Sequence, residues 1–258
     1  MSPDILSVRD GGIATVTLFN PDKLNALNAA MWRRLATTFA ELDADASLRC
    51  IVVRGEGANF AAGGDLLEMR EARATRAGAL SYHATVATAL DAISNCRHPV
   101  IALIRGACIG GGLEIAAACD LRIAGVSARL GAPINRLGFS MYPGELVGLL
   151  RLVGPAVVKE ILLEGRLLTA EEAVRKGVLT RVVAEAELEG EVLATARRIA
   201  AGAPLVARRH KQLIARLVEG APLDASELEA SFAFLDSADY EEGLAAFFEK
   251  RTPRFTGR

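Results

Sequence analysis

Short apolar runs alternate with longer amphipathic stretches along the first part of the chain. Residues 5–8 and 13–18 are rich in β-branched residues and flank Asp10-Gly11-Gly12, which predicts a hairpin. Apolar residues recur at helical spacing over 27–42, and the compact apolar run 50–54 follows as a buried strand. The pattern predicts a β-α-β arrangement.

The alternation continues through the middle of the chain and then gives way to helical periodicity. The elements expected in the middle are a helix over 66–95, a strand over 99–104, a helix over 113–119 and a strand over 121–124. From residue 145 onward the sequence is almost wholly helical, with breaks at 154–155, 202–204 and 220–222. We expect an α/β core over residues 1–195 and a helical region over residues 196–258.

Hydropathy and charge exclude two classes of protein. The mean hydropathy of +0.27 is high, yet Arg, Glu or Gly interrupts every apolar stretch before the roughly 20 residues that a membrane-spanning helix needs. The formal net charge of −1 offers no broad field for nucleic acid or an anionic membrane. The basic run 208–211 is expected on the solvated face of an amphipathic helix. We therefore expect no membrane and no nucleic-acid partner.

Cysteine and histidine usage indicates a reducing compartment and no metal. The four cysteines form no CxxC pair and lie in apolar surroundings, as buried thiols do. None of the three histidines has a ligand at metal-motif spacing. Residues 1–12 lack a basic region followed by an apolar run, so no secretory signal is expected and the expected location is the cytoplasm.

Two predicted strands run into glycine-rich turns, at 54–65 and 105–114. Ligands of open α/β sheets bind beyond the carboxyl ends of strands, where loops and helix starts expose backbone N–H groups. A P-loop is absent, because Leu113 and Glu114 follow the last glycine where Lys and Ser or Thr would stand. A dinucleotide fingerprint breaks at Phe60, and 138–142 lacks the second glycine of a serine-hydrolase elbow.

What remains is Glu114, a carboxylate in the first turn of an apolar helix directly behind three glycines. An acidic residue there also complements the helix dipole, so its position alone does not prove chemistry. Glycines 110–112, however, cost backbone entropy and suit a site where the backbone approaches a ligand or a neighbouring strand.

These segments resemble those of a known family. Residues 60–66, Phe-Ala-Ala-Gly-Gly-Asp-Leu, are similar to its F-x-A-G-A-D-[IL] turn. Residues 99–120 are similar to its K-P-V-I-A…G-G-G-x-E…C-D signature. They begin with Pro-Val-Ile-Ala, contain Gly-Gly-Gly-Leu-Glu and end with Cys-Asp. The family is the enoyl-CoA hydratase/isomerase, or crotonase, superfamily. The resemblance extends nearly end to end, through 20–27, 170–179 and 247–251.

The resemblance implies a crotonase-like ββα superhelix core, a helical C-terminal trimerisation region and a homotrimer or dimer of trimers. Its substrate is an acyl-CoA thioester, with no separate cofactor because coenzyme A is part of the substrate. The N–H groups of Gly64 and Gly111 match the family's oxyanion hole, and losing one such donor commonly costs about 2.7–4 kcal/mol. The substrate-binding positions it implies are Lys23, Leu24, Ala26, Ala62, Asp65, Leu66, Gly110, Pro133, Ile134, Tyr142, Phe248 and Lys250.

The chain departs from the hydratase pattern at one catalytic position. Hydratases of the family hold water between two glutamates, and Ile134 stands where the second is expected. Isoleucine cannot exchange a proton, so it is expected to line an apolar acyl pocket. Tyr142 lies near the place of an isomerase aspartate, and Glu145 is expected to cap a helix rather than to take part in catalysis.

The sequence predicts an enoyl-CoA hydratase/isomerase-like enzyme in which Glu114 is the general acid/base. Three alternatives stay open: a crotonase-like isomerase or decarboxylase rather than a hydratase, a catalytically impaired acyl-CoA-binding protein, and an NAD-dependent enzyme that uses Gly55-x-Gly57.

Overall fold

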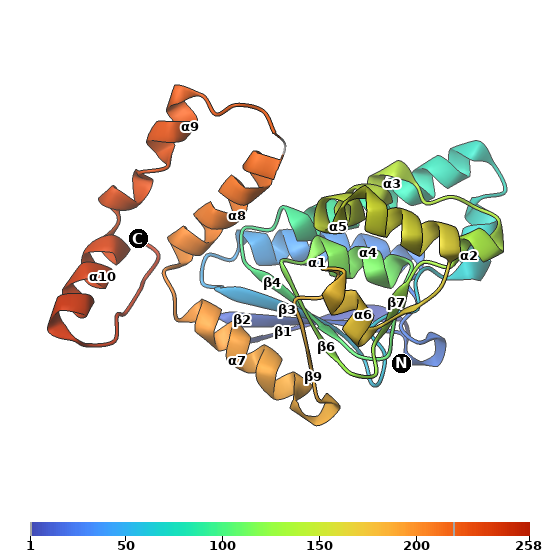
Figure 1. The fold of residues 1–258 in the computed structure, drawn as a ribbon, viewed down its shortest axis with the longest axis horizontal. Helices are drawn as coiled ribbons and strands as arrows, with labels where there is room; N and C mark the ends of the chain where they lie inside the picture. The colour runs from blue at the N-terminus through green and yellow to red at the C-terminus, as the bar shows by residue number, and fades with distance from the viewer. Residues whose placement is uncertain (1, 219) are drawn as a thin grey trace.

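A mostly parallel, six-stranded sheet forms the centre of the computed structural model, which describes residues 2–218 and 220–258 (Figure 1). Its strand order is β1-β2-β3-β4-β6-β9. The strands are β1 (Asp4–Asp10), β2 (Ile13–Phe19), β3 (Cys50–Gly55), β4 (Val100–Ile104), β6 (Leu121–Gly125) and β9 (Arg181–Val183). β1 and β2 form the predicted antiparallel hairpin, and the later strands pair in parallel. The predicted β-α-β start is confirmed.

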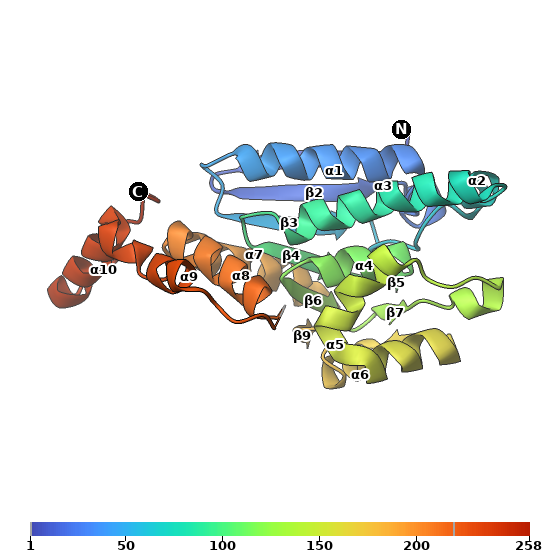
Figure 2. The same cartoon turned by 90° about the horizontal axis from the view of Figure 1, so that it is seen from above.

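Helices cover both faces of this sheet (Figures 1 and 2). The helices over one face are α1 (Ala29–Ala44), α3 (Arg76–Ser94), α4 (Gly111–Ala118) and α5 (Pro143–Glu164), and α7 (Leu188–Ala200) lies on the other. Ile51 and Val53 of β3 join the core beneath the first group, while Cys50 and Val52 pack with α7. This two-sided burial explains why the strands read as continuous apolar runs.

A second, three-stranded sheet lies beside the glycine-rich segments. It consists of β5 (Ala107–Ile109), β7 (Arg129–Gly131) and β8 (Leu168–Thr169). The chain after residue 145 is mainly helical, as predicted, but the prediction missed β8 and β9, which fall there. Each has only two or three residues, which is too short for a period-2 pattern to register.

The long helix predicted over 66–95 is also wrong, because the chain forms α2 (Leu66–Ala72) and α3 with a turn between them. Thr75 starts α3, since its hydroxyl accepts a hydrogen bond from the N–H of Gly78 at 3.0 Å. Arg73 lies in this turn, so the break changes where its side chain points. The predicted break near 154 is confirmed as a kink in α5, where Gly154 adopts φ 71°.

The C-terminal helices extend away from the sheet (Figure 1). They are α8 (Pro204–Val218), α9 (Ala225–Ala230) and α10 (Ala238–Glu249), after α6 (Ala170–Arg175) of the preceding region. Short 3-10 helices occupy Pro21–Lys23, Ile134–Leu137, Glu185–Glu187 and Ala233–Asp236. The division expected at residues 195 and 196 falls inside α7, and it stays a prediction.

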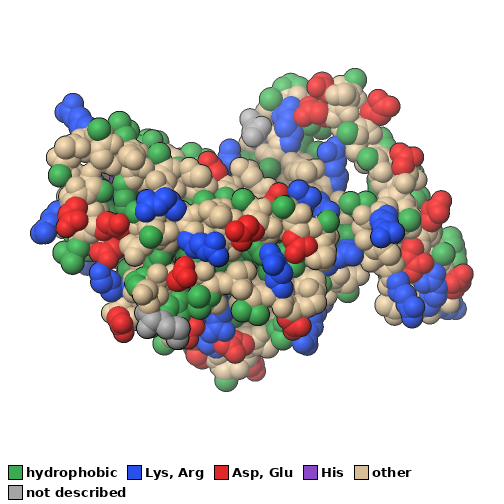
Figure 3. Space-filling view, turned by 180° about the vertical axis from the view of Figure 1, so that it is seen from behind, with side chains coloured by type: hydrophobic (Ala, Val, Ile, Leu, Met, Phe, Trp, Pro, Cys, Tyr) green, Lys and Arg blue, Asp and Glu red, His purple; other side chains and the backbone are tan. Residues whose placement is uncertain are grey.

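The surface carries both signs of charge. Figure 3 shows basic and acidic side chains interspersed over one face of the molecule. Within residues 2–218 and 220–258, every helix is too short or too polar to cross a membrane.

Asn25 joins the loop after β2 to the loop after β3. It is fully buried in the left-handed region at φ 59°, and its amide nitrogen donates to the carbonyls of Glu56 and Asn59 at 2.9 and 2.8 Å. Its side-chain oxygen accepts from the N–H of Asn20 at 3.1 Å. We expect Asn25→Ala to lower the free energy of unfolding by about 3 kcal/mol, because three backbone partners of this buried side chain lose their bonds and alanine disfavours this φ.

Urea-induced unfolding monitored by circular dichroism measures this loss. Asn95→Ala, at an exposed position that ends α3, is the matched control and should change stability little. Equal effects of the two substitutions would contradict the assignment.

Candidate active site

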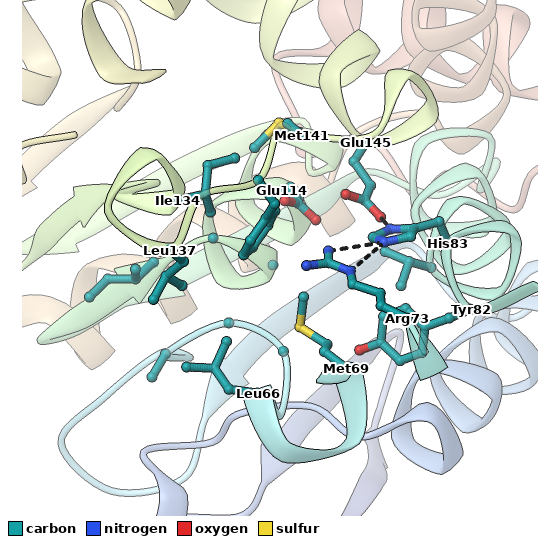
Figure 4. A pocket seen from close by; sticks show the side chains of 18 of the residues that line it. Leu66, Met69, Arg73, Tyr82, His83, Glu114, Ile134, Leu137, Met141 and Glu145 are labelled. Atoms are coloured by element: carbon teal, nitrogen blue, oxygen red, sulfur yellow. Dashed lines mark hydrogen bonds and ion pairs between the residues drawn. The ribbon is translucent and has the colours of Figure 1, made fainter. Parts of the chain in front are cut away.

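A cavity of about 220 Å³ opens where α2, α3, α4 and the start of α5 meet (Figure 4). Its walls are mainly apolar, with Trp32, Leu66, Met69, Val86, Ile109, Ile134, Leu137, Phe139 and Met141. Its polar side chains are Arg73, Tyr82, His83, Glu114 and Glu145. An apolar cavity with a few convergent polar groups is typical of a small-molecule site.

The two glycine-rich turns predicted from the sequence lie side by side at one wall of this cavity. Ala61 and Cys108 form a parallel bridge, in which the N–H of Ala61 donates to Ala107 and the N–H of Ile109 donates to Ala61, both at 2.9 Å. This bridge pairs the turn after β3 with β5, beyond the ends of β3 and β4. The turns thus bring Gly64 and Gly111 to the same cavity.

Gly64 and Gly111 each present a backbone N–H that makes no hydrogen bond within the described part of the chain. Each directly follows a glycine in the left-handed half of backbone space, Gly63 at φ 106° and Gly110 at φ 53°. Glycine adopts that conformation without steric strain. It turns the next N–H away from the direction in which a strand or helix would form its backbone hydrogen bond. Gly111 is also the first residue of α4, where backbone N–H groups lack partners within the helix.

Close packing explains why neither position carries a side chain. A Cβ at Gly111 would lie 2.8 Å from the ring of Trp32, and one at Gly64 would lie 2.7 Å from the sulfur of Met69. A Cβ at Gly112 would meet the carbonyl of Ala61 at 2.4 Å. The glycines therefore let α4 and the turn after β3 approach each other.

Glu114 projects into the cavity from the first turn of α4 and is only 8% exposed. Burial raises its pKa well above the ordinary value of 4.5, and the charge of Glu145 raises this pKa further. Arg73 opposes both effects. Glu114 is thus a carboxyl group that retains its proton above the usual pH, as a general acid requires.

His83 connects Glu145 to Arg73 across the cavity (Figure 4). Its Nδ1 lies 2.5 Å from a carboxylate oxygen of Glu145, and its Nε2 lies 3.2 Å from Nε and 3.0 Å from Nη2 of Arg73. Glu145 does open α5 as expected, but its side chain binds His83 rather than the start of that helix. The capping role expected for this side chain is therefore wrong.

The other predicted site residues divide into two groups. Ala62, Leu66, Gly110, Pro133 and Ile134 line the cavity. Lys23, Leu24, Ala26 and Asp65 lie outside its lining, where the ammonium of Lys23 pairs with Asp65 at 2.5 Å. Tyr142 also lies outside the lining and stacks on His83 with ring centroids 5.3 Å apart.

Phe248 and Lys250 lie far from this cavity, at the end of α10 (Figure 1). Phe248 is 76% exposed, and within one chain it is not part of the lining of this cavity. The described residues contain no cluster of three or more His, Cys, Asp or Glu that could hold a metal ion.

Sequence reasoning missed Arg73 and His83 as site residues. Both fell within the stretch assigned to one continuous helix, where a polar residue is assigned to the solvated face by default. The Arg-Ala-Thr sequence at 73–75, with Thr75 three residues before Gly78, is the signal for a new helix start that would have separated them.

Comparison with known proteins identifies the family. The enoyl-CoA hydratase/isomerase family model matches residues 9–258. The chain belongs to the enoyl-CoA hydratase/isomerase family. The family predicted from the sequence is therefore confirmed, and with it the broad class of enzyme acting on acyl-CoA.

Similar proteins align with almost the whole length of this chain. A crystal structure of an enoyl-CoA hydratase/carnithine racemase from Magnetospirillum magneticum is 48% identical, with a TM-score of 0.97 over 98% of this chain and 96% of that one. A probable enoyl-CoA hydratase of Mycobacterium bovis is 35% identical over 98% of both chains. A short-chain-enoyl-CoA hydratase of Clostridium acetobutylicum is 32% identical over 96% of this chain and 95% of its own. The predicted crotonase fold with C-terminal helices is confirmed.

Because the pKa of Glu114 is raised, the folded protein becomes less stable as pH rises. The folded chain holds this proton to a higher pH than the unfolded chain, so the free energy of unfolding falls from about pH 4.5 up to the folded pKa. Glu114→Gln removes this loss. We expect the variant to gain stability relative to wild type as pH increases from 4.5 to 8.

Unfolding curves at several pH values give the difference in the free energy of unfolding between the two proteins. The contributions of all other titrating groups cancel in this difference. Glu71→Gln, on the exposed side of α2, is the control and should follow wild type. A difference between Glu114→Gln and wild type that does not vary with pH would exclude a raised pKa.

Proposed function

We propose that this chain transforms acyl-CoA thioesters as an enoyl-CoA hydratase/isomerase-type enzyme, with Glu114 as the general acid/base. The observation that carries the proposal is that two unpaired backbone N–H groups, at Gly64 and Gly111, line the same cavity as a buried carboxyl group. The names of the relatives from Mycobacterium bovis and Clostridium acetobutylicum support this class of reaction.

The two N–H groups form an oxyanion hole for the thioester carbonyl. As negative charge develops on that oxygen, two preorganised donors stabilise it, and the start of α4 adds the favourable end of a helix dipole. The charge arises when the α-carbon loses a proton, or when a nucleophile adds to the β-carbon of an enoyl group. Both reactions pass through a thioester enolate, whose oxygen carries the negative charge.

Glu114 supplies the proton transfer. In isomerisation it takes a proton from one carbon and returns it to another, so that the double bond moves and the carboxyl group is restored. In hydration it delivers water to the β-carbon and a proton to the α-carbon. Ile134 lines the cavity where hydratases of the family have a second carboxylate, so one residue must serve both steps.

The coenzyme A portion would lie outside the cavity, across Lys23, Leu24, Ala26 and Asp65. Leu24 accepts a hydrogen bond from the N–H of Ala62 at 2.9 Å, which ties this loop to the turn that carries Gly64. Lys23 is half exposed and its ammonium is held by Asp65, so it offers a charge near the cavity mouth for a phosphate. Tyr142 would act by supporting His83 rather than by contacting the acyl group.

Glu114→Gln should lower turnover of an active enoyl-CoA thioester by about 10²–10⁴-fold while thioester binding is retained, because the amide cannot transfer the proton. Incubation with enoyl-CoA and 3-hydroxyacyl-CoA thioesters in deuterated water, followed by mass spectrometry, measures both product formation and exchange at the α-carbon. Glu71→Gln is the matched control on the exposed side of α2.

Full turnover by Glu114→Gln would remove this residue from the mechanism. Thioester binding by the wild type without exchange or product would favour the acyl-CoA-binding protein over the enzyme. Movement of the double bond without incorporation of oxygen from water would favour the isomerase over the hydratase.

We propose further that the chain assembles as a homotrimer or dimer of trimers through its C-terminal helices. The supporting observation is a series of exposed apolar side chains on α8, α9 and α10, namely Ile214, Leu217, Val218, Leu228, Phe247 and Phe248. Exposed apolar side chains in this number are typical of a subunit interface. In such an assembly Phe248 and Lys250 would reach the coenzyme A of a neighbouring subunit.

Ile214→Asp with Leu217→Asp should dissociate the oligomer, because two charges would then have to be buried at each interface. Light scattering coupled to size-exclusion chromatography gives the mass of wild type and variant. Val8→Asp, at an exposed apolar position on β1, is the control and should leave the mass unchanged. A monomeric wild type would exclude the trimer.

A further inference from the structure

Arg73 places a positive charge in a cavity whose walls are otherwise mainly apolar. It follows the last residue of α2, in the turn before α3. Its guanidinium carbon lies 3.9 Å from the centre of the Phe139 ring, and its Nε and Nη2 donate to His83. Two contacts of different kinds therefore fix the plane of the guanidinium.

The hydrogen-bond pattern determines the form of His83. A guanidinium can only donate, so the Nε2 of His83 accepts, and the hydrogen of the neutral ring is on Nδ1, where it is donated to Glu145. Protonation of Nε2 would set two donors against each other. His83 is thus a neutral spacer that supports Arg73 through its lone pair.

This spacer leaves the charge of Arg73 without a direct counterion. Across the described ranges 2–218 and 220–258, Arg73 forms no ion pair with a carboxylate, and its Nη1 makes no hydrogen bond. Both acidic residues of the cavity are accounted for within the described residues: Glu145 binds His83, and Glu114 forms no ion pair or hydrogen bond with Arg73. A positioned, half-buried cation without an anion is costly unless a ligand supplies one.

We propose that Arg73 binds a carboxylate carried by the acyl group of the substrate. The substrate class is then a coenzyme A monothioester of a short dicarboxylic acid, with the thioester at Gly64 and Gly111 and the free carboxylate at Arg73. A guanidinium fork matches a carboxylate through two parallel hydrogen bonds. The cavity of about 220 Å³ is smaller than the roughly 300–1,000 Å³ of common ligand sites, which favours a short acyl chain.

The proposal rests on the proposed function, because it assumes that an acyl-CoA thioester occupies this cavity. It assigns three polar side chains of the cavity a common role: Glu145 orients His83, His83 orients Arg73, and Arg73 binds the ligand (Figure 4). Arg73 contacts substrate in this scheme, whereas His83 and Glu145 are positioning residues.

Calorimetric binding of matched saturated thioesters tests the proposal without turnover. Each pair consists of the monothioester of a dicarboxylic acid and the thioester of the monocarboxylic acid of equal length. We expect wild type to bind the carboxylated member at least about tenfold more tightly, since a hydrogen bond to a charged group contributes more than a neutral one. Arg73→Met should abolish this preference by weakening only the carboxylated member, and Arg73→Lys should restore part of it.

Arg70→Met is the matched control, because Arg70 lies in α2, three residues before Arg73, and is exposed. It should keep the wild-type preference. Equal binding of both members of every pair by wild type would overturn the proposal even if Arg73→Met failed to fold, and would leave the proposed function intact. A preference that survives in Arg73→Met would overturn it as well. Failure of every thioester to bind would instead reject the proposed function, and this proposal with it.

Discussion

The parallel bridge between Ala61 and Cys108 is the contact on which the candidate site depends. It pairs the turn after β3 with β5 after β3 and β4 have ended, and so holds the two glycine-rich turns side by side. α4 then begins against the turn after β3, at a distance that only glycine at 112 permits. If this bridge opened, the two turns would separate and their N–H groups would no longer face a common point.

Burial of acidic groups is the second constraint, and the site resolves it in two different ways. Glu114 has no cation within ion-pair distance in the described residues, and burial raises its pKa. Glu145 is as deeply buried but forms a short hydrogen bond to the neutral ring of His83. Two carboxyl groups in one cavity thus receive different environments: burial raises the pKa of one, and the other is hydrogen-bonded to a ring nitrogen.

The sequence predicted the parts of this molecule that repeat a pattern or keep a strict motif. The hairpin, the buried strands and the glycine-rich turns have periodicity or composition that one segment reveals by itself. β8 and β9 have neither, because each is short and is defined by its neighbours. The Arg73–His83–Glu145 chain could not be predicted for a related reason, since its members lie on different elements and meet only after the chain turns at 73–75.

The departure at Ile134 is best understood together with that chain. An aliphatic side chain at this wall removes a proton carrier from the side of the cavity that η2 (Ile134–Leu137) contributes. The opposite wall, formed by α2, α3 and the start of α5, carries charge that the resemblance gave no reason to expect. The cavity thus has an apolar side chain at Ile134 and charged or polar side chains at Arg73, His83 and Glu145. An enzyme that had merely lost its proton machinery would have no reason to keep Arg73 so firmly oriented, because even a half-buried charge is costly unless it acts on a ligand.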